Sequence, residues 1–342
     1  MSRITIKKAI AVFCLSVVVI SMSAYQGEGA APQLTSTKAI SVVDGVAEFV
    51  CGTATTGGWV FMWAAAGCKV INDHVPFLNI TAAITTGGNE NIERIIAGEM
   101  AMGAVGTPVS YDYYHGNLEE GIDPHPDIRA VFGSAPNPTC FMVRGDSNYQ
   151  TIEDLKGKKV SINTPGSSSA LTAERILTAL GRGVDTNYYN IQYLNQSESC
   201  DAMKTGALDG MFIGAPAPHA SFTDFFLTAQ GGGRFLAITD EQKKAIFNVL
   251  PYMDDCLVPA GAYHGQTEDY HTVGSYFNFV VMADFPEQLA YEITKALDQN
   301  YNEWCEIFYG SKGSTSQLTI DTLVIPLHPG SERYFREIGL IK

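Results

Sequence analysis

Three short loops, rich in glycine and in side chains with hydroxyl groups, are the segments of this sequence best suited to binding a small molecule. They are residues 53–58, 85–88 and 164–169, and none of them contains a Lys or an Arg. Each follows a segment with the apolar pattern of a strand and precedes one with the periodicity of a helix. Because the first turn of a helix leaves N–H groups unpaired and carries about half a positive charge, it can bind an anion without a cationic side chain. The loops therefore predict a small-anion site; the alternative is that each hydroxyl only caps its own helix.

The elements around these loops occur twice in the same order. In the first copy we predict strands and helices alternating at residues 48–51, 59–68, 75–84, 89–97 and 100–105. In the second copy we predict strands at 160–162, 189–194 and 209–213, with a helix in each interval. Gly58 and Gly166 are separated by 108 positions, as are Gly98 and Gly206. A repeated βαβαβ unit predicts an α/β protein with two lobes, each a mainly parallel sheet flanked by helices.

The segments between and after the copies predict where the chain passes from one lobe to the other. We expect the first crossing at the turn 133–138 and the return at a strand over 234–238. A strand at 273–282 and a helix at 287–299 then complete the first lobe. These boundaries predict lobe I from residues 39–134 plus 240–342, and lobe II from residues 135–239. Two connections form a hinge, and the cleft at the hinge is the expected ligand site.

The beginning of the chain has the composition of a secretory signal peptide. Three basic residues precede the apolar run 9–22, and small residues follow it, so we predict a signal peptide at 1–24 with cleavage near 24–31. The alternative, a single membrane anchor, needs about 20 apolar residues, and this run is shorter. Removing residues 1–24 changes the net charge from −14 to −17, because three basic residues are lost and no acidic ones. So acidic a protein repels nucleic acid and anionic lipid.

Cysteine usage is compatible with an exported protein but does not identify a metal site. Six cysteines follow the predicted signal peptide: Cys51, Cys68, Cys140, Cys200, Cys256 and Cys305. An even number allows disulfides in an oxidising compartment, and fifteen pairings are possible. Cys51 and Cys68 are the nearest in sequence, and buried free thiols are an equal alternative. No CxxC pair occurs, and the histidines have no ligand spacing, so neither a metal nor a cofactor is expected.

An enzymatic alternative rests on the third loop. Residues 166–170 nearly match the G-x-S-x-G nucleophile elbow, which would make Ser168 the nucleophile of a secreted serine hydrolase, with His264 or His271 as its base. However, Ala170 replaces the last glycine, and the duplication gives this loop a counterpart without a nucleophile. We therefore expect a protein that is not an enzyme. A third possibility is a surface or adhesive protein that keeps the fold without binding a solute.

The mature chain resembles the TAXI family, the binding components of one class of TRAP transporters. The matching motifs are Gly52-Thr53 with Gly57-Gly58, Thr86-Gly87-Gly88-Asn89-Glu90-Asn91, Asp154-Leu155-Lys156-Gly157, Pro165-Gly166-Ser167, Gly214-Ala215-Pro216, Pro259-Ala260-Gly261-Ala262-Tyr263-His264-Gly265 and Pro326-Leu327-His328-Pro329-Gly330. The resemblance implies a type II periplasmic-binding fold, closure of the cleft on the ligand, and delivery to a membrane permease driven by an ion gradient. It also implies ligands such as glutamate, 2-oxoglutarate and related carboxylates.

Loops and resemblance together define the predicted site. The expected ligand-binding residues are Thr55, Thr56, Gly57, Gly58, Trp59, Phe61, Thr86, Gly87, Gly88, Asn89, Asn91, Gly166, Ser167, Ser168, Ser169 and Pro216. The sequence departs from the family pattern at Val60-Phe61, where hydroxylated aromatic residues are usual. It also has Gly88 where a Ser is usual and Ser168 where a Gly is usual. We therefore expect a periplasmic receptor for a small organic anion, partnered by a TRAP permease, with an altered pocket.

Overall fold

The computed structural model describes residues 34–117 and 121–342, and residues 34–342 belong to one compact unit. The predicted signal peptide at 1–24 and its cleavage region at 24–31 lie outside the described residues. Within the described ranges, none of the helices combines the length and the apolar character needed to cross a bilayer.

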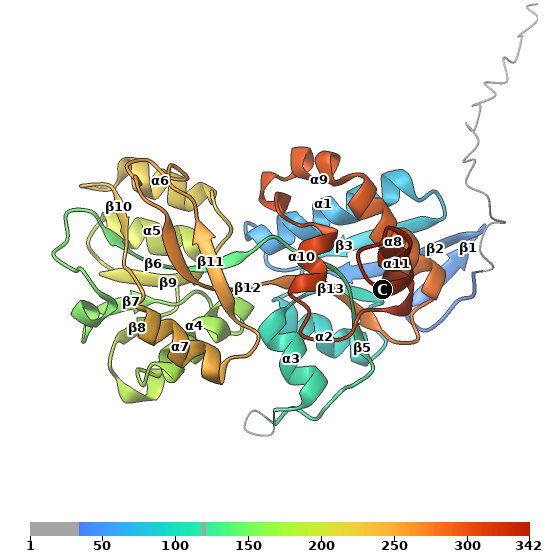
Figure 1. Cartoon of the computed structure of the whole chain (residues 1–342), viewed down its shortest axis with the longest axis horizontal. Coiled ribbons are helices and arrows are strands. Elements are labelled where there is room, and N and C mark those ends of the chain that lie inside the picture. Colours follow the sequence, from blue (N-terminus) through green and yellow to red (C-terminus); the bar gives the residue numbers. More distant parts are fainter. Residues whose placement is uncertain (1–33, 118–120) are drawn as a thin grey trace, which may run out of the picture. The chain divides into compact units, whose positions relative to one another are not determined.

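Lobe I is built on a six-stranded sheet (Figure 1). Its strands are β1 (Ile40–Val43), β2 (Val46–Gly52), β3 (Leu78–Ala83), β4 (Met102–Gly106), β5 (Ile128–Gly133) and β13 (Phe277–Met282). The order is β1-β2-β4-β13-β5, and β3 also pairs with β2. Its helices are α1 (Trp59–His74), α2 (Gly88–Ile96), α3 (Thr107–His115), α8 (Glu287–Gln299), α9 (Tyr301–Ile307), α10 (Ser316–Asp321) and α11 (Pro329–Glu337). A short 3₁₀ turn, η3, covers Tyr309–Ser311.

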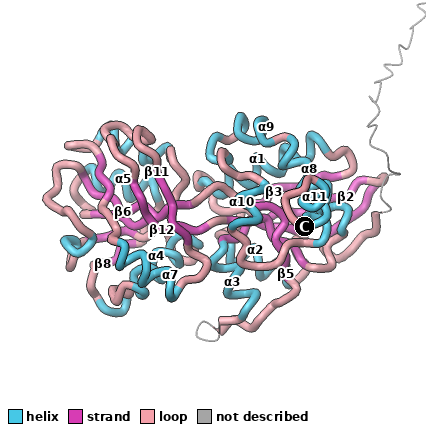
Figure 2. Tube along the Cα trace, viewed as in Figure 1, coloured by secondary structure: helices cyan, strands magenta, loops and turns pink. Residues whose placement is uncertain are grey.

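Lobe II is built on a seven-stranded sheet. Figure 2 shows its strands in magenta and its helices in cyan. The strands are β6 (Asn137–Arg144), β7 (Lys159–Ser161), β8 (Asn190–Gln192), β9 (Gly210–Gly214), β10 (Gly233–Phe235), β11 (Asp254–Val258) and β12 (Tyr270–Ser275). The order is β11-β12-β6-β9-β7-β8, and β10 also pairs with β6. The helices are α4 (Ser168–Ala179), α5 (Gln196–Lys204), α6 (Ala220–Thr228) and α7 (Asp240–Val249), with 3₁₀ turns η1 (Ile152–Leu155) and η2 (Val184–Thr186).

The predicted α/β class with two sheets flanked by helices is confirmed. The two predicted copies correspond to β2-α1-β3-α2-β4 and β7-α4-β8-α5-β9, and the strands within each copy are parallel. The remaining strand pairs are antiparallel, so the expectation that each sheet is mainly parallel is wrong: each sheet is mixed, with parallel pairing confined to its repeated unit. The repeat is therefore the part of the sequence that sets parallel pairing.

The chain returns to lobe I later than predicted. The segment 234–238 was expected to lead back, but β10 pairs with β6 and stays in lobe II. Helix α7 packs against α4, and strands β11 and β12 follow in the same sheet, so residues 240–275 belong to lobe II and not to lobe I. The single strand expected over 273–282 is two strands, separated at Tyr276. Thr107 marks the break: its N–H donates to the Tyr276 carbonyl (2.8 Å), and its hydroxyl accepts from the Tyr276 N–H (3.2 Å).

The two chain segments that cross between the lobes are hydrogen-bonded to each other. The first crossing lies between β5 and β6, as predicted. At that point the Ser134 N–H donates to the Phe277 carbonyl (2.7 Å), and the Ser134 hydroxyl accepts from the Phe277 N–H (2.9 Å). On the lobe II side, Asn137 and Pro138 pair with the last two residues of β12. The two crossings therefore form one ribbon of paired backbone.

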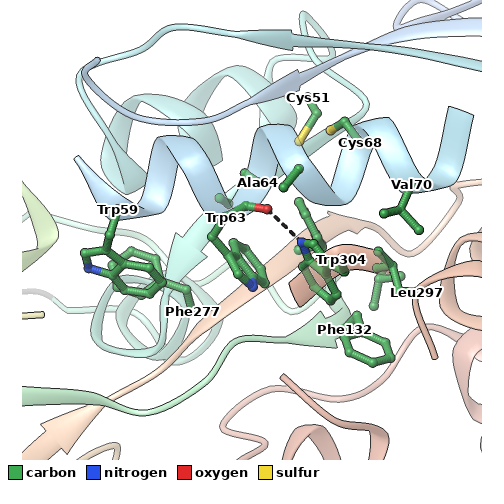
Figure 3. Packing of buried hydrophobic residues seen from close by; sticks show 14 of the residues in the cluster. Cys51, Trp59, Trp63, Ala64, Cys68, Val70, Phe132, Phe277, Leu297 and Trp304 are labelled. Atoms are coloured by element: carbon green, nitrogen blue, oxygen red, sulfur yellow. Dashed lines mark hydrogen bonds between the residues drawn. The ribbon is translucent and has the colours of Figure 1, made fainter. Parts of the chain in front are cut away.

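An aromatic cluster in lobe I extends from the core toward the hinge (Figure 3). Trp63 stacks on Phe279 with ring centroids 4.5 Å apart, and its carbonyl accepts the indole N–H of Trp304 (3.2 Å). Trp59 precedes Trp63 by one helical turn. The ring centroids of Trp59 and Phe277 are 5.1 Å apart and their planes are at 85°, which is an edge-to-face contact. Trp59 is thus held rigidly at the first turn of α1.

Candidate functional site

A cavity of about 420 Å³ lies where the ends of both repeated units meet, and residues of both lobes line it. Its volume is within the range of small-molecule pockets. Residues of all three predicted loops line this cavity. The structure therefore brings together segments that are more than one hundred positions apart in the chain.

The first and third loops contain the same tight turn. Thr55 and Thr164 each accept, through the backbone carbonyl, an N–H three residues on, at 3.3 and 3.2 Å. The third position of each turn is a glycine with positive φ, +84° at Gly57 and +76° at Gly166. This is the geometry of a type II turn, which requires glycine at that position. Gly57 and Gly166 are therefore the equivalent pair, 109 positions apart, and not Gly58 and Gly166 as the sequence register suggested.

Five helices begin at the cavity. The residues Trp59, Gly88, Ser168, Gln196 and Ser221 line it, and they belong to the first turns of α1, α2, α4, α5 and α6. The first-turn N–H groups of a helix have no partner within that helix, and the helix dipole makes this end positive. The starts of α1, α4 and α6 have no acidic side chain in the first turn and produce a local preference for negative charge in a protein that is strongly acidic overall. In the first turns of α2 and α5, Glu90 and Glu198 offset the dipole.

Side-chain charge is missing from the cavity lining. No Asp, Glu, Lys or Arg occurs among the described residues that line it. The one histidine, His219, is the N-cap residue of α6, and its ring is 4.9 Å from that of Phe222. Burial lowers the pKa of His219 to about 4, so the imidazole is neutral at pH 7. The cavity is therefore polar but uncharged.

Three polar side-chain atoms of the lining have no hydrogen-bond partner: Trp59 Nε1, Ser168 Oγ and His219 Nδ1. Trp59 is 3% exposed and Ser168 is 7% exposed, so neither side chain is well hydrated. A buried polar group without a partner costs free energy, and most such groups in proteins are paired. All three atoms are therefore available to pair with a molecule in the cavity.

Most of the predicted ligand residues line the cavity. They are Thr55, Thr56, Gly57, Gly58, Trp59, Thr86, Gly87, Gly88, Ser167, Ser168 and Ser169. Phe61, Asn89, Asn91, Gly166 and Pro216 do not line it. Asn91 has a different use, because its amide donates to the carbonyls of Thr53 (2.7 Å) and Ala104 (2.8 Å) and so supports the first loop from beneath. Gly166 is in the third loop's turn, between two residues that do line the cavity.

The fourth strand-to-helix loop was missed. Asn195, Gln196 and Ser197 line the cavity at the start of α5, which is the counterpart of α2 in the repeat. The duplication therefore contained the information needed to find them. His219 and Phe277 also line the cavity, but they come from α6 and β13, which are outside the repeat. No sequence pattern indicated either residue.

Two of the three departures from the TAXI pattern, Gly88 and Ser168, are neighbours in space. A Cβ placed on Gly88 would lie 2.8 Å from the Ser168 hydroxyl, and one on Gly106 would lie 3.3 Å from the Ser168 Cβ. The hydroxyl of Ser168 in lobe II therefore occupies space that a side chain at position 88 of lobe I would need. Because Gly88 has no side chain, there is room for the hydroxyl of Ser168.

The serine hydrolase arrangement is not formed. The Ser168 hydroxyl has no hydrogen-bond partner, and neither His264 nor His271 lines the cavity. Tyr263, next to His264, is 3% exposed, and its hydroxyl accepts the backbone N–H of His219 at 3.0 Å. Tyr263 therefore supports the start of α6. In the part of the chain that the structure covers, the six cysteines are free thiols, and His, Cys, Asp and Glu form no cluster able to hold a metal.

A buried ion pair joins the lobes beside the cavity. Arg175 on α4 pairs with Asp112 on α3, and Arg175 also donates to the Tyr252 hydroxyl at 3.0 Å. The two charged side chains are 12% and 8% exposed. A pair this buried is costly to break by removing one partner, so it contributes to holding these two helices together.

Comparison with known proteins identifies relatives over most of the chain. The sequence model of the NMT1-like family matches residues 51–339. Similar solved structures include the periplasmic aliphatic sulphonate binding protein SsuA from Escherichia coli (18% identity, TM-score 0.44, 84% of this chain and 82% of that one). They also include a TctC solute binding protein from Polaromonas (13%, 0.49, 86% and 98%). A third is the GluR0 ligand-binding core from Nostoc punctiforme in complex with L-glutamate (15%, 0.43, 77% and 97%). These similarities concern the fold alone and do not identify a ligand for this protein.

Proposed function

This chain belongs to the NMT1-like family, and we propose that it is an exported solute-binding receptor that captures a small organic anion in the cavity between its lobes. The observation that carries the proposal is the convergence of five helix starts, three of them without an acidic first-turn residue, on a cavity with unpartnered polar atoms and no charged side chain among its described lining residues. Such a site attracts an anion through fixed dipoles and holds it with amide and hydroxyl donors.

The residues proposed to contact the ligand are the loop residues that line the cavity, together with Asn195, Ser197 and His219. The ligand would contact donors of both lobes at once, so it would favour the arrangement in which the lobes are closed. A receptor of this kind releases its solute to a membrane permease. We propose a TRAP-type permease as that partner and the periplasm as the compartment, on the resemblance to the TAXI family.

A thermal-shift screen of the mature protein tests the proposal. The panel comprises dicarboxylates, keto acids, hydroxy acids, amino acids and sulfonates at millimolar concentration. A ligand at 100 times its Kd stabilises the folded state by about 2.7 kcal/mol, which corresponds to a rise in Tm of roughly 5 °C for a protein of this size. A panel that leaves the Tm unchanged would argue against the receptor function.

Variants then connect binding with the cavity. Ser169→Ala removes a hydroxyl at the start of α4 and should weaken binding by about 1.5–3 kcal/mol if that hydroxyl donates to an anion. Ser167→Ala removes a hydroxyl that donates to the Thr164 carbonyl (2.8 Å) and accepts from the Ala170 N–H (3.1 Å), so it should weaken binding by disturbing the turn and the cap. Thr178→Ala, near the exposed far end of the same helix, is the matched control. Calorimetric affinities that are equal for all three variants would remove these serines from the site.

A further inference from the structure

The cavity has an imbalance between hydrogen-bond donors and acceptors. Several backbone carbonyls of its loops already accept hydrogen bonds within the protein. The Thr55 carbonyl accepts from Gly58, the Thr164 carbonyl accepts from both the N–H and the hydroxyl of Ser167, and the Gly87 carbonyl accepts from Asn91. The starts of α1, α2 and α6 have no side-chain cap, so their first-turn N–H groups stay available, whereas Ser167 and Asn195 already accept one N–H each at α4 and α5. Donors are therefore in excess over acceptors.

The unpartnered side chains add to this excess. The indole N–H of Trp59 can only donate, and the Ser168 hydroxyl can donate while its neighbours in the loop supply no acceptor to it. The lining has no carboxylate, because no Asp or Glu occurs among the described residues that form it. A group that brings its own N–H donors and a positive charge would meet the positive starts of α1, α4 and α6, which have no acidic residue in the first turn, and no carboxylate among the described lining residues. Glu90 and Glu198, in the first turns of α2 and α5, accept the N–H groups of Thr86 and Asn195, and the unpartnered Nδ1 of His219 belongs to a neutral ring.

We infer that the cavity selects organic acids without an amino group, and that Trp59 and Ser168 are specificity-determining donors for the acid group. The inference rests on the proposed receptor function and narrows its substrate class. A carboxylate and a sulfonate both offer only acceptors, so both have the required chemistry. An α-amino acid does not, because its ammonium group would be desolvated without a carboxylate to pair with it. A phosphate monoester that retains a proton is disfavoured for a similar reason.

The remaining wall of the cavity fits an apolar portion of the ligand. Val60, Pro165 and the rings of Trp59 and Phe277 line it. The two rings pack edge to face, so their positions are fixed before a ligand arrives. A compact acid with an apolar chain or ring would bury that surface against them.

Calorimetry with matched pairs of ligands tests the inference. The pairs are 2-oxoglutarate and glutamate, pyruvate and alanine, phenylpyruvate and phenylalanine, and ethanesulfonate and taurine. In every pair that binds, we expect the amine-free member to bind at least about a hundredfold more tightly, which is about 2.8 kcal/mol. An amino compound that binds as tightly as its partner would overturn the inference and leave the receptor function in place. If no acid of either kind binds, the proposed function fails and the inference with it.

Two variants test the assigned donors. Trp59→Phe keeps a ring against Phe277 but removes the indole N–H, and Ser168→Ala removes only the hydroxyl. Each should weaken binding of the amine-free ligand about tenfold or more. Thr178→Ala on α4 should leave the affinity unchanged, and circular dichroism with the Tm shows that each variant is folded. Unaltered affinity in both cavity variants would exclude Trp59 and Ser168 as determinants.

Discussion

His219 makes the stability of this protein depend on pH in a way that one substitution can isolate. The imidazole is half-buried beside Phe222, no charged side chain shares the described cavity lining with it, and the titratable Tyr263 hydroxyl contacts its backbone N–H. Burial lowers the pKa from 6.5 to about 4. The unfolded chain therefore binds a proton at His219 more readily than the folded chain does, so stability falls as the pH is lowered from 6.5 toward 4.

The size of the effect follows from the shift in pKa. At about pH 5 the pH is 1.5 units below 6.5, the ordinary pKa of the imidazole in the unfolded chain. Each unit corresponds to 1.36 kcal/mol, so the free energy of unfolding falls by about 2 kcal/mol relative to neutral pH. His219→Gln keeps a planar polar side chain but cannot be protonated in this range. The difference in unfolding free energy, variant minus wild type, should therefore rise by about 2 kcal/mol when the pH is lowered from 7.5 to 5.

Urea unfolding of both proteins at the two pH values measures this difference. All other titrating groups are shared, so their contributions cancel in the comparison. His264→Gln, at an exposed position, is the control and should show no such change. If His219→Gln and the wild type lose equal stability on acidification, the imidazole is not kept neutral by burial and the reasoning is wrong.

Three further perturbations address packing around the site. Gly88→Ser should lower ligand affinity about tenfold by crowding Ser168, and in a Ser168→Ala background, where the crowded hydroxyl is absent, it should cost little further affinity, as measured by calorimetry. Gly330→Ala would place a Cβ 2.1 Å from a backbone carbonyl oxygen of α8, so urea unfolding should show a loss of about 2–3 kcal/mol; an unchanged midpoint would contradict this close approach. Asp112→Asn should cost about 3 kcal/mol by leaving Arg175 without its carboxylate, and adding Arg175→Met should recover part of that loss. A double variant no more stable than the single one would refute the pairing.

The repeat explains why much of the site could be predicted. Each strand-to-helix loop has local chemistry that its sequence expresses, such as the glycine that a type II turn requires at positions 57 and 166. The order of elements then places equivalent loops at equivalent strand ends. The same logic applied to the second loop of lobe II would have found residues 195–197.

The return crossing could not be predicted in the same way. Strand β10 has only three residues, and whether it pairs in lobe I or lobe II depends on contacts with β6, ninety positions earlier in the chain. The break at Tyr276 depends on Thr107, which lies 169 positions earlier in the chain. His219 and Phe277 reach the cavity through such long-range contacts. Side chains positioned by tertiary structure leave no periodic pattern in the sequence.

The hydrogen-bonded ribbon at 133–138 and 274–278 limits how the two halves of the molecule can move. Two independent tethers would permit swinging, twisting and sliding. A pair of strands joined through Ser134 and Phe277 resists stretching and shear, because either motion breaks backbone hydrogen bonds, and it bends most easily across its flat face. Opening and shutting should therefore follow a single axis. The donors of both halves would then return to the same relative positions at every cycle of capture and release.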